Sequence, residues 1–413
     1  MKPGIRRQLG ALAVAVALLT RAGAATADTY DVESLVRKAR SDNPELVAAR
    51  FDRSAAEADL RTASALENPT LRLEWLHMQE DRVSRMGFGA GLAWTPPQPG
   101  VWGAGKDEAR AKIEVVKADL RERAAAVESD VRKLCAAIDS VREAEQLADR
   151  SVATRKSLVE ALARRVDRGA STRIDLVTAR LSLTRAERDR DLLALEHARG
   201  LRELAMVVGL PASTLLELRA PEPSDESDPL PLTAPSPQLF AGDRGRAEAA
   251  QASLSKERAR RYPWLQLASL PRFRVNEQSS YPLDFAVAVD VTLPIFDQNG
   301  GRIDKARASI AKLEAEHRAH ATAVEGALGI ARLEVERRRD ALAYLEASVA
   351  PLVKEHGALV EAALKNGELD IPAVLAADDA AVRAQRDVVE ARLAHRLARI
   401  ALLRSQGAYL RSP

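Results

Sequence analysis

Histidines are the side chains of this 413-residue chain most able to hold a metal ion, and they are scattered. Of the six, only His317 and His320 have the i, i+3 spacing that places two imidazoles on one face of a helix. Such a pair could ligate a metal, but a polar face of a coiled coil is the simpler interpretation. His77 and Met78 form too small a cluster for a site. We therefore predict no metal site.

Motifs for catalysis and for cofactors are missing from the sequence. It contains no G-x-S-x-G, phosphate-binding loop, C-x-x-C or H-E-x-x-H pattern. Its single cysteine, Cys135, cannot form a disulfide within the chain and is expected to be a small buried residue. We predict that the protein is not an enzyme, has no catalytic residues and binds no cofactor.

The composition favours long helices. Hydrophobic residues make up 46 % and charged residues 29 %, whereas aromatic residues make up only 4 %. This profile is typical of coiled coils and long helices, which bury narrow seams and not one large core. The chain is therefore predicted to be mainly helical.

The first 27 residues are predicted to be a secretory signal peptide. Basic residues precede an apolar run at 9–19, and Ala25-Thr26-Ala27 has the small-residue pattern of a cleavage site. The run is shorter than the roughly 20 residues that a spanning helix needs. Four basic residues and no acid lie before Asp28, so subtracting these charges from the net +3 leaves −1. A nucleic-acid partner is therefore not expected.

Two glycines punctuate very long helical stretches. No glycine or proline occurs at 106–168 or at 170–199, so Gly169 is predicted to join two antiparallel helices. Gly367 stands in a similar context 198 residues later. The chain is thus predicted to contain a duplicated helical hairpin. Pro351, before the second turn, is expected to kink or break its helix.

Four short segments have the period-two alternation of strands. They lie at 70–78, 86–94, 264–275 and 283–293, and all four tryptophans lie in or beside them. Aromatic residues favour strands in general and also form the girdles of membrane barrels. Four strands cannot close a barrel, and open edges are not tolerated in lipid, so a membrane location would require several chains.

The order of helix, helix, strand, strand, long helix, turn and helix therefore occurs twice. The predicted domains are the signal peptide at 1–27, a first repeat at 28–220, a Pro-, Ser- and Asp-rich linker at 221–237, and a second repeat at 238–413. The first repeat has strands at about 70–94 and a hairpin tip at 169. The second has strands at about 264–293 and a tip at 367.

This duplicated order, with RVDRGASTRIDLVTARL at the first tip and LKNGELDIPAVLAADDAA at the second, resembles the outer-membrane factor (TolC-like) family. The resemblance covers essentially the whole chain after the leader. The form GELDIPAVLAA and the DQNGGRI turn are most similar to the heavy-metal efflux branch.

The resemblance implies a homotrimer, with helical hairpins forming an α-barrel in the periplasm and four strands per chain forming a 12-stranded transmembrane β-barrel in outer-membrane lipid. Such a duct would passively conduct substrate, including heavy-metal cations, from an inner-membrane pump of the proton-driven cation efflux type. A periplasmic adaptor would dock at the tips, which carry Arg168, Gly169, Ala170, Ser171, Asn366, Gly367 and Glu368.

The resemblance also suggests a gate. Asp175 matches the acidic position six residues after the first tip glycine, but the equivalent position in the second copy is Ala373. Asp370 is therefore the second candidate gate residue. Asp378 and Asp379 are nearby acids that could also substitute, but a solvated charge on a helix face is the simpler interpretation of all three aspartates.

Two other classes of protein remain as alternatives. A periplasmic adaptor also has a leader and a helical hairpin, but it would be expected to have a single hairpin flanked by glycine-rich β domains. A soluble coiled-coil scaffold would explain the helical periodicity, yet it would leave the strands and the leader unexplained.

Overall fold

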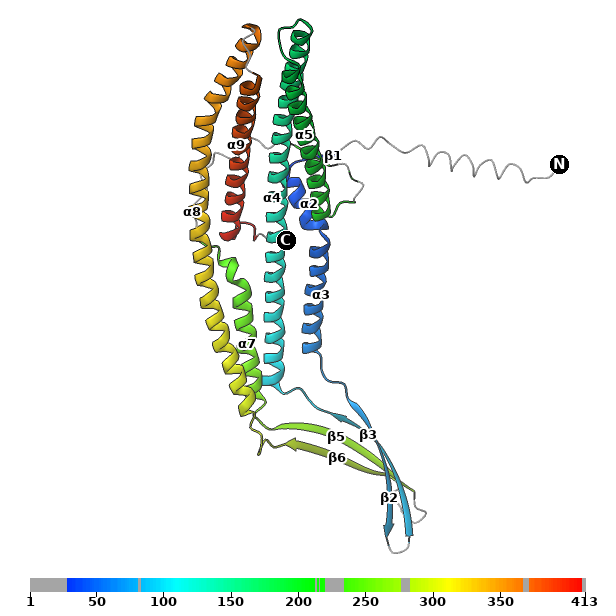
Figure 1. Ribbon diagram of the computed structural model, residues 1–413. Coiled ribbons are helices and arrows are strands. Elements are labelled where there is room, and N and C mark those ends of the chain that lie inside the picture. The colour runs from blue at the N-terminus through cyan, green and yellow to red at the C-terminus, as the bar shows by residue number, and fades with distance from the viewer. Residues whose placement is uncertain are drawn as a thin grey trace, which may run out of the picture. The chain divides into compact units, whose positions relative to one another are not determined.

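The computed structural model describes residues 28–80, 83–211, 214, 216–219, 234–275, 283–366 and 371–410. The leader at 1–27 and most of the linker at 221–237 lie outside these ranges. The elements, labelled in Figure 1, are β1 Asp28–Tyr30, α2 Val32–Asp42, α3 Pro44–Ser64, β2 Thr70–Glu80, β3 Val83–Trp94, α4 Pro99–Asp167, α5 Arg173–Val208, β4 Leu216–Leu218, η1 Pro237–Phe240, α7 Ala241–Ala259, β5 Trp264–Val275, β6 Leu283–Thr292, α8 Gly300–Asn366 and α9 Ile371–Ser405. The prediction of a mainly helical chain with four strand segments is confirmed.

The described chain forms two compact units. Unit 1 combines residues up to 47 with 124–234 and 327–411, and unit 2 combines 48–123 with 235–326. Each unit therefore takes residues from both of the predicted repeats. The reason is that α4 and α8 are long enough, at 69 and 67 residues, to contribute to both units.

Unit 2 contains a four-stranded antiparallel sheet in the order β2-β3-β5-β6 (Figure 1). The register places Leu71 opposite Leu92, and Trp75 opposite Phe88. Directly opposed residues lie on the same face of a sheet. One face is therefore apolar across neighbouring strands, while β2 and β6 remain as the two edges.

Two helices of unit 2, α4 and α7, pack closely on each other. A Cβ atom built on Gly245 of α7 would lie 2.9 Å from Cγ2 of Val115 in α4, so only glycine permits this approach without a shift. Lys256 Nζ lies 3.2 Å from Glu108 Oε2 and joins the same two helices. Before α8, Asn299 adopts a positive φ of 61° and donates from Nδ2 to the backbone oxygen of Glu257.

Unit 1 holds the remainder of the two long hairpins, with the α4–α5 turn and the end of α8 at the same end of the unit (Figure 1). A buried cluster of Leu158, Leu162, Ala179, Ile371 and Leu375 joins α4, α5 and α9. Apolar side chains in that cluster stabilise the unit by leaving water. β1 pairs in parallel with β4 in the same unit.

Of the two outcomes predicted at Pro351, a break is wrong, because α8 runs through it as one helix, and a kink stays a prediction. Proline removes one backbone hydrogen bond and crowds the preceding turn. Val349 and Val353, on either side, line a groove with α9. Such side-chain packing, and not local propensity alone, stabilises most protein helices.

Candidate functional site

The turn between α4 and α5 is built around Gly169, the first predicted tip glycine. Gly169 has φ +72°, in the left-handed region that favours glycine. Its N–H donates to Val166 O at 2.9 Å, and the N–H of Ala170 donates to Arg165 O at 2.8 Å. These two bonds form the Schellman arrangement that ends a helix. The predicted helix end at Gly169 therefore has a direct physical cause.

A capping box begins α5 three residues later. Asp175 N donates to Thr172 Oγ1 at 3.2 Å, while Asp175 Oδ2 accepts from Thr172 N at 3.1 Å. Thr172 Oγ1 also lies 2.7 Å from Asp175 Oδ2. The carboxylate predicted as a gate thus satisfies one backbone donor and one hydroxyl at the start of the helix. The T-x-x-D spacing in the sequence could have revealed this role.

The residues predicted for docking are only partly within the described chain. Arg168, Gly169 and Ala170 are exposed at the first turn, and Ser171 is half-buried. Asn366 is the last residue of α8. Gly367, Glu368 and Asp370 lie outside the described residues. Docking at both tips therefore stays a prediction.

Arg155 forms a buried polar junction between α4, α5 and α9. Its Nη1 donates to Ser182 Oγ at 2.8 Å, and its Nη2 donates to Asp378 Oδ2 at 3.0 Å and to Asp379 Oδ1 at 2.5 Å. The side chains of Arg155 and Asp378 are only 8 % and 19 % exposed. The interpretation of Asp378 as a solvated charge is therefore wrong, because its carboxylate is largely buried and paired. No pattern in the sequence indicated this pair, since Arg155 lies 223 residues away.

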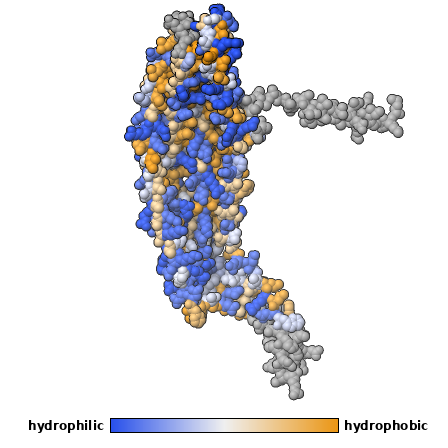
Figure 2. Space-filling view, viewed as in Figure 1, coloured by the Kyte–Doolittle hydropathy of each residue, from blue (hydrophilic) through white to orange (hydrophobic). Residues whose placement is uncertain are grey.

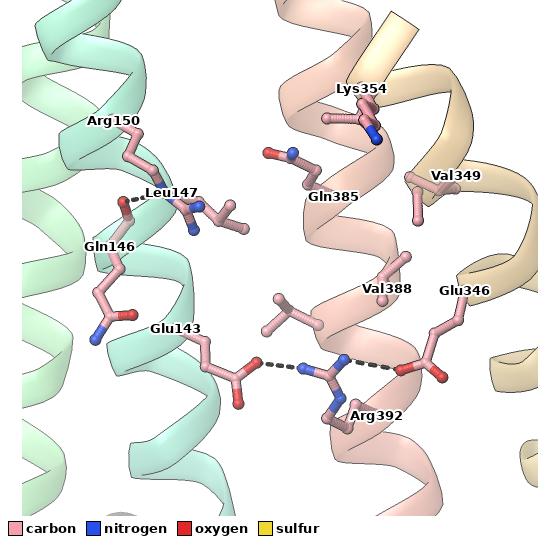
Figure 3. Close-up of a pocket in the computed structure, with 13 residues that line it drawn as sticks. Glu143, Gln146, Leu147, Arg150, Glu346, Val349, Lys354, Gln385, Val388 and Arg392 are labelled. Atoms are coloured by element: carbon pink, nitrogen blue, oxygen red, sulfur yellow. Dashed lines mark hydrogen bonds and ion pairs between the residues drawn. The ribbon is translucent and has the colours of Figure 1, made fainter. Parts of the chain in front are cut away.

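A groove of about 670 Å³ lies between α4, α8 and α9 (Figure 3). Arg392 of α9 reaches across it, with Nη1 2.7 Å from Glu143 Oε2 and Nη2 2.8 Å from Glu346 Oε1. Aliphatic side chains such as Leu147 and Val349 line it together with polar ones. The guanidinium therefore ties three helices together within unit 1.

The predicted histidine pair lies in unit 2 and faces a carboxylate. His317 Nδ1 lies 3.1 Å, and His320 Nδ1 2.7 Å, from Asp243 Oδ2 of α7. Both imidazoles also contact the ring of Phe240 edge-on. Burial would raise the pKa of Asp243, but hydrogen bonds from His320, His317 and Arg246 lower it to about 2. The pair thus fastens α8 to α7.

Other chemistry-bearing groups are structural. Within the described ranges, no group of three or more His, Cys, Asp or Glu side chains could hold a metal ion. Cys135 is buried, as predicted, and burial raises the pKa of its thiol to about 12. It is therefore not a reactive thiolate near neutral pH.

Apolar side chains are left uncovered on the sheet of unit 2. The most exposed lie on the two edge strands, where Trp75 of β2 is 71 % exposed and Phe285 of β6 is 68 % exposed. Orange side chains are visible on the described part of the sheet in Figure 2. On the opposite face of β2, Arg72 Nε and Glu74 Oε1 form an ion pair at 3.2 Å. The sheet therefore has one apolar and one polar face.

Two helices of unit 1 carry further uncovered apolar stripes. On α5, exposed residues recur with steps of three, four and eleven, which keep them near one helix face: Ile174, Val177, Leu181, Leu192, Leu195 and Met206. On α8 the exposed set is Ile330, Leu333, Tyr344, Leu352 and Leu359. Stripes of this kind are typical of surfaces that pack against a partner.

No helix in the described part of the chain is long and apolar enough to cross a membrane.

Comparison with known proteins identifies the architecture. Residues 35–210 match the family model described as outer membrane efflux protein. The fold matches the crystal structure of CusC with a TM-score of 0.77 at 16 % identity, covering 91 % of each chain. It matches the Campylobacter jejuni CmeC outer membrane channel with a TM-score of 0.75 at 13 % identity, covering 91 % of this chain and 85 % of that one. It matches the open state of the Neisseria gonorrhoeae MtrE outer membrane channel with a TM-score of 0.74 at 17 % identity, covering 92 % of this chain and 90 % of that one. No curated protein sequence matches the chain.

Proposed function

We propose that the chain is the exit duct of a tripartite efflux system, because residues 35–210 match the outer membrane efflux protein family model and the fold matches solved outer-membrane channels. Three copies form a passage that conducts solutes delivered by an inner-membrane pump through a periplasmic adaptor. The duct supplies no catalysis. Transport energy comes from the pump.

The observation that carries this proposal is the sheet of unit 2, which has an uncovered apolar face and two unpaired edges. Water does not favour so much exposed aromatic and aliphatic surface, whereas membrane lipid does. Lipid in turn excludes open strand edges, because unpaired backbone groups cannot find hydrogen-bond partners there. Pairing β6 of one copy with β2 of the next resolves both problems, and three copies supply twelve strands.

The apolar stripes of α5 and α8 support the same assembly. They are different surfaces of one chain, so packing α5 of one copy on α8 of the next is a heterologous contact. Heterologous contacts repeat around an axis and generate rings when the rotation closes. The helical hairpins of three copies then surround a central passage.

The tip residues predicted from sequence are proposed to meet the adaptor. The Gly169 turn exposes Arg168 and Ala170 and is held by its own backbone hydrogen bonds. We retain Asp175 and Asp370 as proposed gate residues. For Asp175 the capping box implies a second role, in which its carboxylate fixes the direction of α5.

Heavy-metal cations are the proposed substrates, delivered by a proton-driven cation pump. The motifs GELDIPAVLAA and DQNGGRI carry this part of the proposal. Fold similarity does not favour one substrate class over another, because this chain matches CusC and CmeC about equally well. Growth of a deletion strain on copper, silver, zinc and hydrophobic drugs, with and without the chain restored, would identify the substrate class.

The duct is tested by fractionation together with a tip variant. We expect the protein in outer membranes as a heat-sensitive trimer, and recovery from the soluble periplasmic fraction would refute the duct in favour of an adaptor or scaffold. Gly169→Val should abolish restored resistance while the trimer persists. Gly357→Val, at a helical glycine with open space around it, is the matched control. Full resistance in Gly169→Val would overturn the tip assignment.

A further inference from the structure

A second, polar pocket of about 320 Å³ lies in unit 1 between α4, α5 and α9. Four guanidinium groups line it, those of Arg155, Arg185, Arg383 and Arg386, together with the carboxylates of Asp189 and Asp379. Positive charges are therefore in excess. The pocket is separate from the turn at Gly169 and from the groove crossed by Arg392.

Both carboxylates of this pocket already have cationic partners. Asp379 accepts from Arg155 Nη2, and Asp189 Oδ1 lies 3.2 Å from Nη2 of Arg188, which is outside the pocket. Arg155 is in turn saturated by Ser182, Asp378 and Asp379. Of the other three arginines, Arg185 and Arg383 are exposed to water and Arg386 is half-buried.

Arg185, Arg383 and Arg386 form no ion pair or hydrogen bond with the described chain. The Nε atom of Arg386 is also buried without a hydrogen-bond partner among the described residues. A buried polar donor left unpaired is costly, and native structures rarely keep one without a ligand, ion or water to receive it. Arg392, by contrast, reaches two glutamates across its own groove.

We propose that the pocket binds a small solute through a phosphate or sulfate group. A guanidinium presents paired N–H donors in one plane, which match two oxygens of such an anion. Arg383 and Arg386 come from α9 and Arg185 from α5, so one bound anion would bridge the two helices. Binding at this position would strengthen the packing of unit 1. This inference goes beyond conduction and does not depend on what the duct exports.

The test uses the purified full chain and inorganic phosphate, with sodium chloride and acetate at equal ionic strength as references. Equilibrium dialysis should give one saturable phosphate site per chain, and phosphate should raise the unfolding temperature by mass action. Arg383→Gln with Arg386→Gln should weaken phosphate binding by about tenfold for each charge-assisted hydrogen bond that the substitutions remove. Arg386→Lys should be intermediate, because it keeps the charge but does not present the planar fork. Arg338→Gln, at an exposed arginine of α8 outside the pocket, should bind as the wild type does.

Three results would overturn the proposal. Equal stabilisation by chloride, acetate and phosphate would reveal only a general salt effect. Unchanged phosphate binding in the double variant would place the anion elsewhere. Dissociation of the trimer in the double variant, with no phosphate bound by the wild type, would mean that acidic side chains of a second copy fill the pocket.

Discussion

Replacing Arg155 with methionine should loosen the packing of α4, α5 and α9 by about 2–3 kcal/mol. Removing one member of a fully buried ion pair costs about 3–5 kcal/mol, because the other charge is left without a partner. Asp378 is 19 % exposed and Asp379 is 51 % exposed, so water compensates part of that cost. The expected cost therefore lies below the fully buried range.

The two aspartates supply a matched pair of further variants. Asp378→Asn should cost about 1.5–3 kcal/mol, as expected for a largely buried charged hydrogen bond. Asp379→Asn should cost about 0–1 kcal/mol, as expected for an exposed pair. The two residues are adjacent and share one partner, but Asp378 is less exposed and accepts from both Nε and Nη2 of Arg155, so the difference measures burial together with the second hydrogen bond.

Hydrogen exchange of the detergent-purified protein measures the loss of stability around the Arg155 junction. Amides around Leu162 and Ala179, in the buried cluster next to the junction, should exchange about 30- to 150-fold faster in Arg155→Met, since each 1.4 kcal/mol is a factor of ten. Equal acceleration by the two aspartate variants would contradict the burial argument. Wild-type protection in Arg155→Met would show that the junction does not stabilise unit 1.

Two other predictions concern the tip turn and the histidine pair. Gly169→Ala should destabilise the folded chain by about 1–2 kcal/mol because Gly169 has a positive φ, although no atom lies within 4 Å of the new Cβ. Gly357→Ala, at a helical position that is equally open, should stabilise the folded chain by about 0.5–1 kcal/mol. If both changes have the same sign in thermal unfolding, backbone conformation is not the cause. Asp243→Asn should lower the stability of unit 2 at pH 7 by about 2 kcal/mol, since the pKa of Asp243 falls from 3.8 to about 2 on folding. A depressed carboxyl pKa stabilises in full above the unfolded value, so the wild type should lose this contribution as the pH falls from about 4 to about 2, where the difference from Asp243→Asn should vanish. A difference that does not depend on pH would refute the linkage.

Local features of the chain were predictable because their causes are local. Alternation of side chains located the strands, and the isolated Gly169 located a helix end that the structure explains by a positive φ. Cys135 was correctly expected to be buried. Such signals need only neighbouring residues.

Contacts between distant segments were not predictable in this way. Arg155 meets Asp378 across 223 residues, and His320 meets Asp243 across 77. No spacing rule links such positions, because the pairing depends on how whole helices pack. The continuity of α8 through Pro351 was not predictable for the same reason, since helix packing outweighs one missing backbone donor.

The open sheet edges also govern how assembly can fail. An unassembled chain carries unpaired backbone along the eleven residues of β2 and the ten of β6, next to an apolar face. Such edges are templates for adding further strands. Because the two edges differ, each addition regenerates a free β2 and a free β6, and growth stops only when a ring closes. Misassembly should therefore yield open polymers of variable length, and not a discrete dead-end dimer.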